Sequence, residues 1–147
     1  MAGHGGAHAG PAAGVDCVTA PGPKNDAFAA LLGIDVRRRG AGHTVATLTT
    51  DEHHANPHGT VHGAVFYAVA GAAVAAAAND DEHSGIVTSV LVEYLRPAAI
   101  GDVLLAEVSR EVSTEREDIF IGTVRRGDQG DDLAWVRARG TRRSRQA

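Results

Sequence analysis

The sequence predicts an α+β domain in which one long, alanine-rich helix is wrapped by an antiparallel sheet of five to six strands. The helix is predicted because residues 61–79 carry nine alanines between Ala64 and Ala78. A helix that is small on every side is typical of one buried closely against a sheet. Four segments with strand character follow it in succession. Strands joined in this way run antiparallel, and the single apolar helix must lie against them.

The chain has 147 residues, which suits one domain with a real core. Hydrophobic residues make up 44% of it but aromatic residues only 4%, so the core must rest on Ala, Val, Leu and Ile. Residues 1–23 are rich in Gly, Ala, Pro and His and cannot bury much apolar area. We therefore expect a disordered tail over 1–23 and the folded domain over 24–147.

A short helix is predicted at the start of the domain. Asn25 or Asp26 can cap it, and Gly33 ends it. Its apolar residues, which share one face, are Phe28, Leu31 and Leu32.

The remaining elements follow from alternation and from turn residues. Residues 51–60 are polar and interrupted by Pro57 and Gly59, which predicts a loop leading into the long helix. Residues 80–85 form a polar connection after it. The predicted strands are residues 34–39 and 43–50 before the helix, and residues 86–95, 103–113, 119–126 and 133–141 after it.

Charge and composition argue against several classes of protein. The formal net charge of −4 lacks the basic excess of a nucleic-acid-binding protein. The basic stretch 137–145 is either a solvated last strand and tail or a patch for the phosphates of a nucleotide-like ligand. Cys17 is the single cysteine, so no internal disulfide can form. No signal peptide is evident, and the alanine-rich run is too short and small-sided to span a bilayer, so no membrane partner and a cytoplasmic location are expected.

The segment from Asn56 to Gly63 carries the chemistry. It reads Asn-Pro-His-Gly-Thr-Val-His-Gly and leads directly into the long helix. The first N–H groups of a helix have no partner within it and carry partial positive charge. At Gly63 a substrate carbonyl can approach such an N–H closely, because no side chain stands in the way. His62 and Asn56 flank this position and can orient the carbonyl or a water molecule.

An oxyanion site of this kind suits a thioester. Its leaving thiolate has a pKa near 8.5, far below that of an alkoxide, so no strong general acid is needed. Polarising the carbonyl and delivering a water molecule would suffice.

The string Asn-Pro-x-Gly-x-Val-His-Gly before an alanine-rich helix resembles the phenylacetate-pathway and thioesterase-superfamily branch of the hotdog-fold acyl-CoA thioesterases. Residues 28–33 resemble the family's first helix, and residues 93–98 with Gly101-Asp102 resemble its strand and turn after the long helix. The resemblance covers residues 26–143. It implies a hotdog fold, an acyl-CoA substrate whose coenzyme A is the only cofactor-like group, and a homodimer or a dimer of dimers.

The resemblance also implies roles for single residues. Gly63 would supply the oxyanion N–H, His62 would hold the thioester, and Asn56 would position water or the carbonyl. The family carries an Asp or Glu eight residues after that glycine, where this chain has Gly71, and Ala64 replaces the second glycine of its His-Gly-Gly. Further substrate-binding candidates are His58, Gly59, Tyr67, Gly71 and Thr88.

Helix geometry bears on the missing carboxylate. Eight helical residues span about 12 Å, so one helix cannot offer both Gly63 and residue 71 to the same carbonyl. The two positions must come from different chains across a two-fold interface. His58 can titrate near neutrality and so substitute for the carboxylate, and Thr88 and Ser89 can orient water. Glu93 is interpreted as an interface or edge residue.

Two alternatives to an enzyme stay open. Because Gly71 lacks the carboxylate, the chain can instead be a catalytically weak protein that binds acyl-CoA. The histidines crowded into the loop could also suggest zinc, but Pro57 and Gly59 break the helix that would align them and no cysteine lies nearby, so no metal is expected. The four histidines are His53, His54, His58 and His62.

Overall fold

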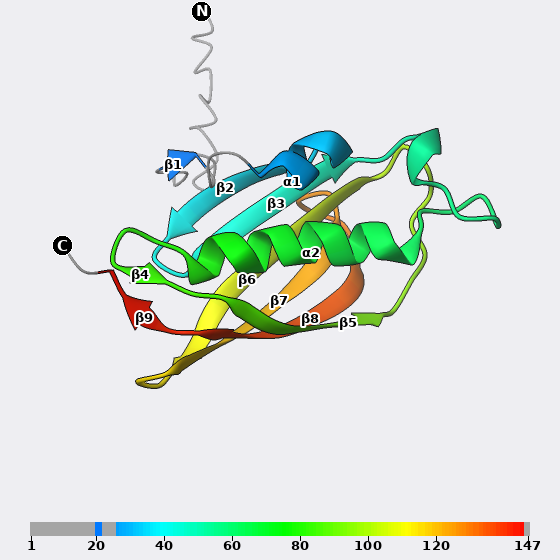
Figure 1. The fold of residues 1–147 in the computed structure, drawn as a ribbon. Helices are drawn as coiled ribbons and strands as arrows, with labels where there is room; N and C mark the ends of the chain where they lie inside the picture. The colour runs from blue at the N-terminus through cyan, green and yellow to red at the C-terminus, as the bar shows by residue number, and fades with distance from the viewer. Residues whose placement is uncertain (1–19, 22–25, 146–147) are drawn as a thin grey trace, which may run out of the picture.

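The computed structural model describes residues 20–21 and 26–145 of the chain (Figure 1). Most of the expected tail, together with Cys17 and Asn25, lies outside the described residues. Ala20–Pro21 form a two-residue strand, β1, which pairs with the next strand of the chain.

One antiparallel sheet dominates the fold and confirms the predicted fold class. Its strand order is β1-β2-β3-β6-β7-β8-β5, and every neighbouring pair is antiparallel. Because β5 stands last in this order, it forms a free edge of the sheet. The six longer strands are β2 (Asp35–Gly40), β3 (His43–Thr49), β5 (Val87–Tyr94), β6 (Val103–Ser113), β7 (Glu117–Arg126) and β8 (Asp132–Thr141).

The long helix α2 (Gly63–Ala78) crosses one face of the sheet, as Figure 1 shows. Ten of its 16 residues are buried, because alanine and valine side chains let its backbone approach the strands closely. It begins two residues later than residues 61–79 predict, since Val61 N–H donates to Ala98 O at 2.9 Å and is drawn into the loop. No helix in the described part of the chain combines the length and the apolar character needed to cross a membrane.

The short helix α1 (Ala27–Leu32) forms where it is predicted, beside α2. Asp26 caps it, and Gly33 ends it in the left-handed conformation with φ 81°. Only Leu32 of its predicted apolar face packs partly against the core. Phe28 is 62% and Leu31 80% exposed, whereas the small Ala29 is buried. The helix therefore presents large apolar side chains outward.

Three short elements complete the fold. A one-turn 3-10 helix, η1 (Glu52–His54), interrupts the predicted loop. The expected connection after α2 contains β4 (His83–Ser84), which pairs with the C-terminal strand β9 (Arg143–Ser144).

Much of the charge in the basic C-terminal stretch is used by the chain itself. Asp118 is 1% exposed and lies 3.0 Å from Arg110 Nε and 3.1 Å from an Arg142 guanidinium nitrogen. Arg142 also contacts His83 Nε2 at 2.9 Å, and Arg139 lies 3.6 Å from Glu117. These contacts join the last residues of the chain to neighbouring strands. They favour a structural role for Arg139 and Arg142.

Candidate active site

The loop before α2 is shaped by Asn56. Its Oδ1 accepts the backbone N–H of His58 at 2.9 Å and that of Thr60 at 3.1 Å. Its Nδ2 donates to Thr60 Oγ1 at 2.8 Å, and its main-chain N–H donates to Thr60 O at 2.8 Å. The turn needs Gly59, whose φ of 81° other residues rarely adopt. Asn56 thus holds a closed five-residue turn.

This network restricts what Asn56 can offer a ligand. The oxygen of the carboxamide is already shared between two N–H groups of the loop. A carboxamide has a second Nδ2 hydrogen, however, and no described residue accepts it. Asn56 is therefore placed as a hydrogen-bond donor, while its acceptor capacity organises the loop.

His62 is the residue that caps α2. Its Nδ1 accepts the Ala64 N–H at 2.9 Å, and its own N–H donates to His54 O at 2.8 Å. Because Nδ1 is an acceptor, a neutral His62 ring carries its proton on Nε2, at an exposed position. The buried His54 in turn accepts the Asp51 N–H at its Nδ1, at 2.9 Å.

Gly63 offers the N–H that the sequence predicts. It is the first residue of α2, and its N–H has no hydrogen-bond acceptor among the described residues. Its carbonyl accepts the Tyr94 hydroxyl at 2.7 Å. A Cβ at position 63 would lie 3.3 Å from that hydroxyl oxygen, so a glycine is what lets Tyr94 reach the helix.

Tyr94 is a site residue that the sequence did not reveal. It ends β5 and packs edge-on against Phe66 of α2, with ring centroids 5.6 Å apart. Burial raises the pKa of the Tyr94 hydroxyl above its ordinary value, so the group is a proton donor across the neutral range. The sequence signal was an aromatic residue within the string 93–98, but its hydrogen-bond partner, Gly63, is 31 residues away.

A pocket of about 360 Å³ opens beside the start of α2. Two of the predicted catalytic residues, Asn56 and Gly63, line it. The pocket is also lined by Thr60, Phe66, Tyr94 and Arg96.

A second cavity of about 420 Å³ lies along the outer side of α2, beneath α1. Tyr67 and Gly71, both predicted to bind substrate, line it. A Cβ at Gly71 would meet nothing within 4 Å, so the cavity reaches the helix backbone there. Apolar residues dominate its wall, including Phe28 and Ile34, and Asp26 also lines it.

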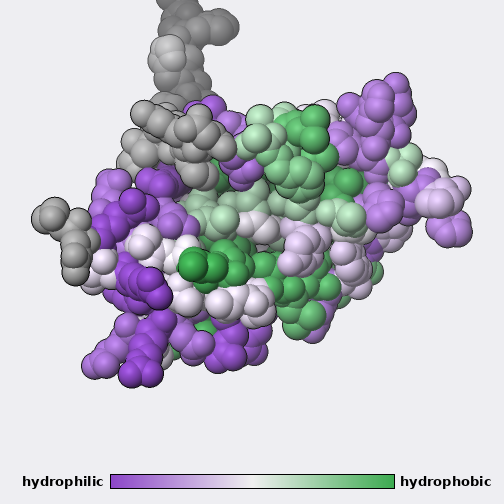
Figure 2. Space-filling view, viewed as in Figure 1, coloured by the Kyte–Doolittle hydropathy of each residue, from purple (hydrophilic) through white to green (hydrophobic). Residues whose placement is uncertain are grey.

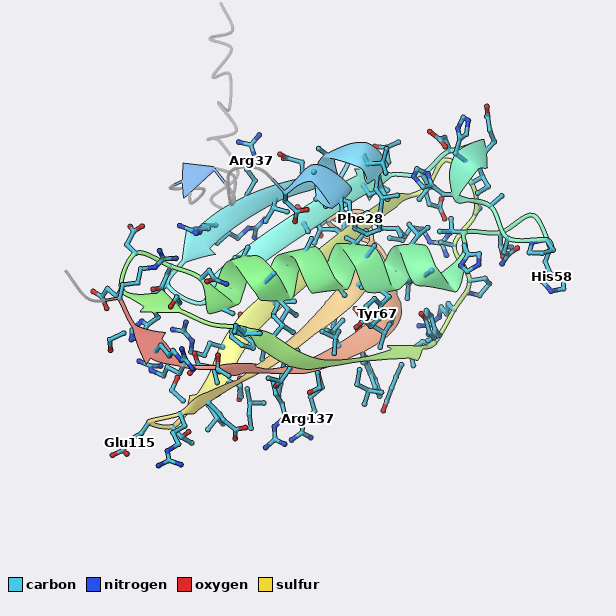
Figure 3. The ribbon with its side chains drawn as sticks, viewed as in Figure 1. Phe28, Arg37, His58, Tyr67, Glu115 and Arg137 are labelled. Atoms are coloured by element: carbon cyan, nitrogen blue, oxygen red, sulfur yellow. The ribbon has the colours of Figure 1, made fainter. Side chains whose placement is uncertain are left out.

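Four predicted residues line neither of these pockets within one chain: His58, Gly59, His62 and Thr88. His58 sits at the tip of the loop and points away from α2 (Figure 3). Thr88 lies at the opposite end of β5 from Tyr94, and its hydroxyl donates to Arg139 O at 3.3 Å. Among the described residues, no group of three or more His, Cys, Asp or Glu side chains is placed to hold a metal ion.

Comparison with known proteins points to one family. The thioesterase superfamily model matches residues 58–111. The acyl-coenzyme A thioesterase PaaI of Escherichia coli is 34% identical over 83 residues, a match that covers 56% of this chain and 59% of that protein's length. A Deinococcus radiodurans protein named "Putative esterase" is 30% identical over 132 residues, which cover 86% of each chain.

The fold agrees with these matches. The structure of the E. coli PaaI protein from the phenylacetic acid degradation operon superposes with a TM-score of 0.75 and 27% identity. The superposition covers 81% of this chain and 86% of that one.

Proposed function

The chain belongs to the thioesterase superfamily, and we propose that it hydrolyses an acyl-CoA thioester to the free acid and coenzyme A. The observation that carries the proposal is that Gly63, whose N–H has no acceptor among the described residues, lines the same pocket as Asn56. Coenzyme A would be part of the substrate, and no other cofactor is proposed. The cytoplasmic location expected from the sequence stays a prediction.

Each donor has a role in the proposed reaction. The Gly63 N–H would bind the carbonyl oxygen, where a single oxyanion donor can contribute about 3 kcal/mol in the transition state. Asn56 Nδ2–H would hold either that oxygen or the attacking water. His62 would present Nε2–H to the thioester from its capping position. After water adds, the C–S bond breaks and the thiolate leaves without needing a strong acid.

We further propose that the working unit contains two copies of the chain. β5 is a sheet edge of eight residues, and no described strand pairs with its outer side. Unpaired edges of this length readily add a strand from another chain. Figure 2 shows hydrophobic surface over α1 and along α2 toward β5. Two aromatic side chains of these elements are also exposed, Tyr67 by 49% and Tyr94 by 54%. A second copy at this side would cover that surface and bring its own Gly63 toward the cavity at Gly71.

A protein that binds acyl-CoA without hydrolysing it remains the second candidate. The observation that favours it is Gly71, because the position lacks the carboxylate on which the family's hydrolysis depends. A hydrolysis assay decides between the two, since both functions use the same pocket.

The assay measures thiol release from short, medium and aryl acyl-CoAs. The sharpest variant is Asn56→Asp, which keeps an oxygen for the His58 and Thr60 N–H groups but removes the Nδ2 donor. We expect a 10- to 100-fold loss of kcat/KM, about 1.4 to 2.8 kcal/mol. Glu52→Gln is an isosteric control on the exposed side of the same loop.

The outcomes separate the candidates. Turnover that falls in Asn56→Asp but not in Glu52→Gln supports the enzyme. Tight acyl-CoA binding with no turnover in the wild-type protein supports the binding protein. Sedimentation should give the mass of two or four chains, and a fully active monomer would refute the shared site.

A further inference from the structure

If the chain is a hydrolase, as proposed above, some group must take a proton from the attacking water. The pocket beside Gly63 does not provide one. Its described lining residues include no carboxylate and no histidine. Arg96 is a permanent cation, and Tyr94 is a donor engaged by Gly63 O. A base has to reach the reaction from another part of the molecule.

The cavity beneath α1 contains a carboxylate. Among its described lining residues, Asp26 alone has one, and the wall is otherwise apolar apart from the hydroxyl of Tyr67. The cavity runs along α2 from Ala64 to Ala75, a span of about 16 Å. Because Gly71 lacks a side chain at the middle of this span, an acyl group and a water molecule can reach the backbone of α2.

Asp26 is held in place but not used up. Its Oδ1 accepts the Ala29 N–H at 2.9 Å, which fixes the side chain at the start of α1. The helix itself is anchored by the buried Ala29 and by the Ile34 N–H, which donates to Ala29 O at 2.8 Å. No described residue forms a hydrogen bond or ion pair with the second carboxylate oxygen, which is free to bind water.

Other titratable groups are less suitably placed. His58 points away from α2 at the tip of its loop (Figure 3). Glu93 faces outward on the sheet, opposite Trp135 of β8, and not toward α2. Asp80 accepts two backbone N–H groups and lies 3.3 Å from Arg110.

We propose that Asp26 is the general base of the reaction and takes the place of a carboxylate on α2 at position 71. A water molecule in the cavity gives one proton to Asp26. The oxygen of that water molecule bonds to the thioester carbon. The electrons of the carbonyl double bond move to the carbonyl oxygen, which the Gly63 N–H of the second copy holds. The oxyanion's electron pair then re-forms the C=O bond of the carboxylic acid product while the C–S bond breaks, and the C–S electron pair leaves with sulfur. Asp26 then returns the proton to the thiolate or to solvent.

The first test is Asp26→Asn in the full-length protein. Asparagine caps helices as well as aspartate does, so Tm should stay within about 2 °C of the wild type. Loss of a general base should lower kcat about 100-fold or more while KM stays unchanged. The matched control is Asp81→Asn, which changes a fully exposed carboxylate of the loop after α2 and should leave kcat unaltered.

The second test is a rescue. Gly71→Asp introduced into the Asp26→Asn protein should recover at least about tenfold of the lost kcat, because the open space at Gly71 admits the side chain. A structural role for Asp26 predicts no such recovery.

The failures are distinguishable. If the wild-type protein hydrolyses acyl-CoA and Asp26→Asn has normal kcat, Asp26 is not the base while the proposed function stands. The inference is also overturned if Asp26→Asn lowers Tm together with kcat and Gly71→Asp does not restore kcat. A wild-type protein without turnover on any acyl-CoA overturns the proposed function and the base together.

Discussion

Substituting Gly63 and Tyr94 together tests the geometry at the start of α2. In Gly63→Ala the new methyl group would lie 3.3 Å from the Tyr94 hydroxyl oxygen, closer than nine in ten real Cβ contacts. The hydroxyl must then move and weaken its 2.7 Å hydrogen bond to Gly63 O. Tyr94→Phe removes the hydroxyl, and the next nearest ring atoms lie at 3.4 and 3.5 Å from the methyl group, in ordinary contact.

The two backgrounds should therefore respond differently to the same methyl group. Alanine in a helix gains about 0.5–1 kcal/mol over glycine, whereas losing the hydrogen bond costs about 1 kcal/mol. In the wild type these effects nearly cancel. In the Tyr94→Phe background Gly63→Ala should stabilise the protein, which gives an interaction free energy of about 1 kcal/mol.

The assay is urea unfolding of the four proteins of this double-mutant cycle at one protein concentration, because association shifts apparent stability. An interaction free energy within error of zero would refute the contact between Tyr94 and Gly63. It would also remove the structural reason for glycine at position 63.

The charges on the outer side of the sheet and at its C-terminal end yield further predictions. Burial alone would raise the pKa of Glu107, but hydrogen bonds from His43 and Arg125 and the charges of Arg125 and Arg39 outweigh it and lower the pKa. A lowered pKa adds stability that is full above the unfolded value of 4.5 and is lost as the pH falls through the folded value. Glu107→Gln should therefore lower the free energy of unfolding at pH 7, and the difference from wild type should shrink in urea titrations below about pH 4.5. Asp118→Asn should cost roughly 3 kcal/mol or more, because it removes the buried carboxylate that Arg110 and Arg142 share and leaves Arg110 with Asp80 as its remaining acidic partner; a loss below 1 kcal/mol by urea unfolding would contradict this.

The bounds of an element were predictable where alternation of apolar and polar residues ends at clear turn residues. Strand β6 matches residues 103–113 at both ends, because its alternation is interrupted sharply by turn residues on either side. The start of α2 was not predictable to the residue. Val61 continues the apolar pattern of the helix, but its N–H is taken by Ala98 O from a distant turn. Such a tertiary hydrogen bond leaves no mark in the local sequence.

The candidate site shows the same division. Asn56 and Gly63 line one pocket, because both belong to a short contiguous string that a single turn folds up. The roles of Tyr94 and of the second cavity depend on how β5 and α1 lie against α2. Packing sets these positions. The pairing register of β5 with β8 is also irregular between Val87 and Ser89. Sequence spacing therefore could not tell which of Tyr94 and Thr88 faces the helix start.

The small side chains of α2 have two consequences for chemistry. On its inner side, alanine and valine bring the backbone close to the sheet and fix where the Gly63 N–H points. On its outer side, the same absence of bulk leaves a cavity at Gly71, where α2 itself offers no carboxylate. Because α1 covers that cavity, its capping residue Asp26 can supply the carboxylate that α2 lacks. The absence of charged residues from α2 is then compatible with hydrolysis, provided the carboxylate and the oxyanion donor reach the same thioester from two copies of the chain.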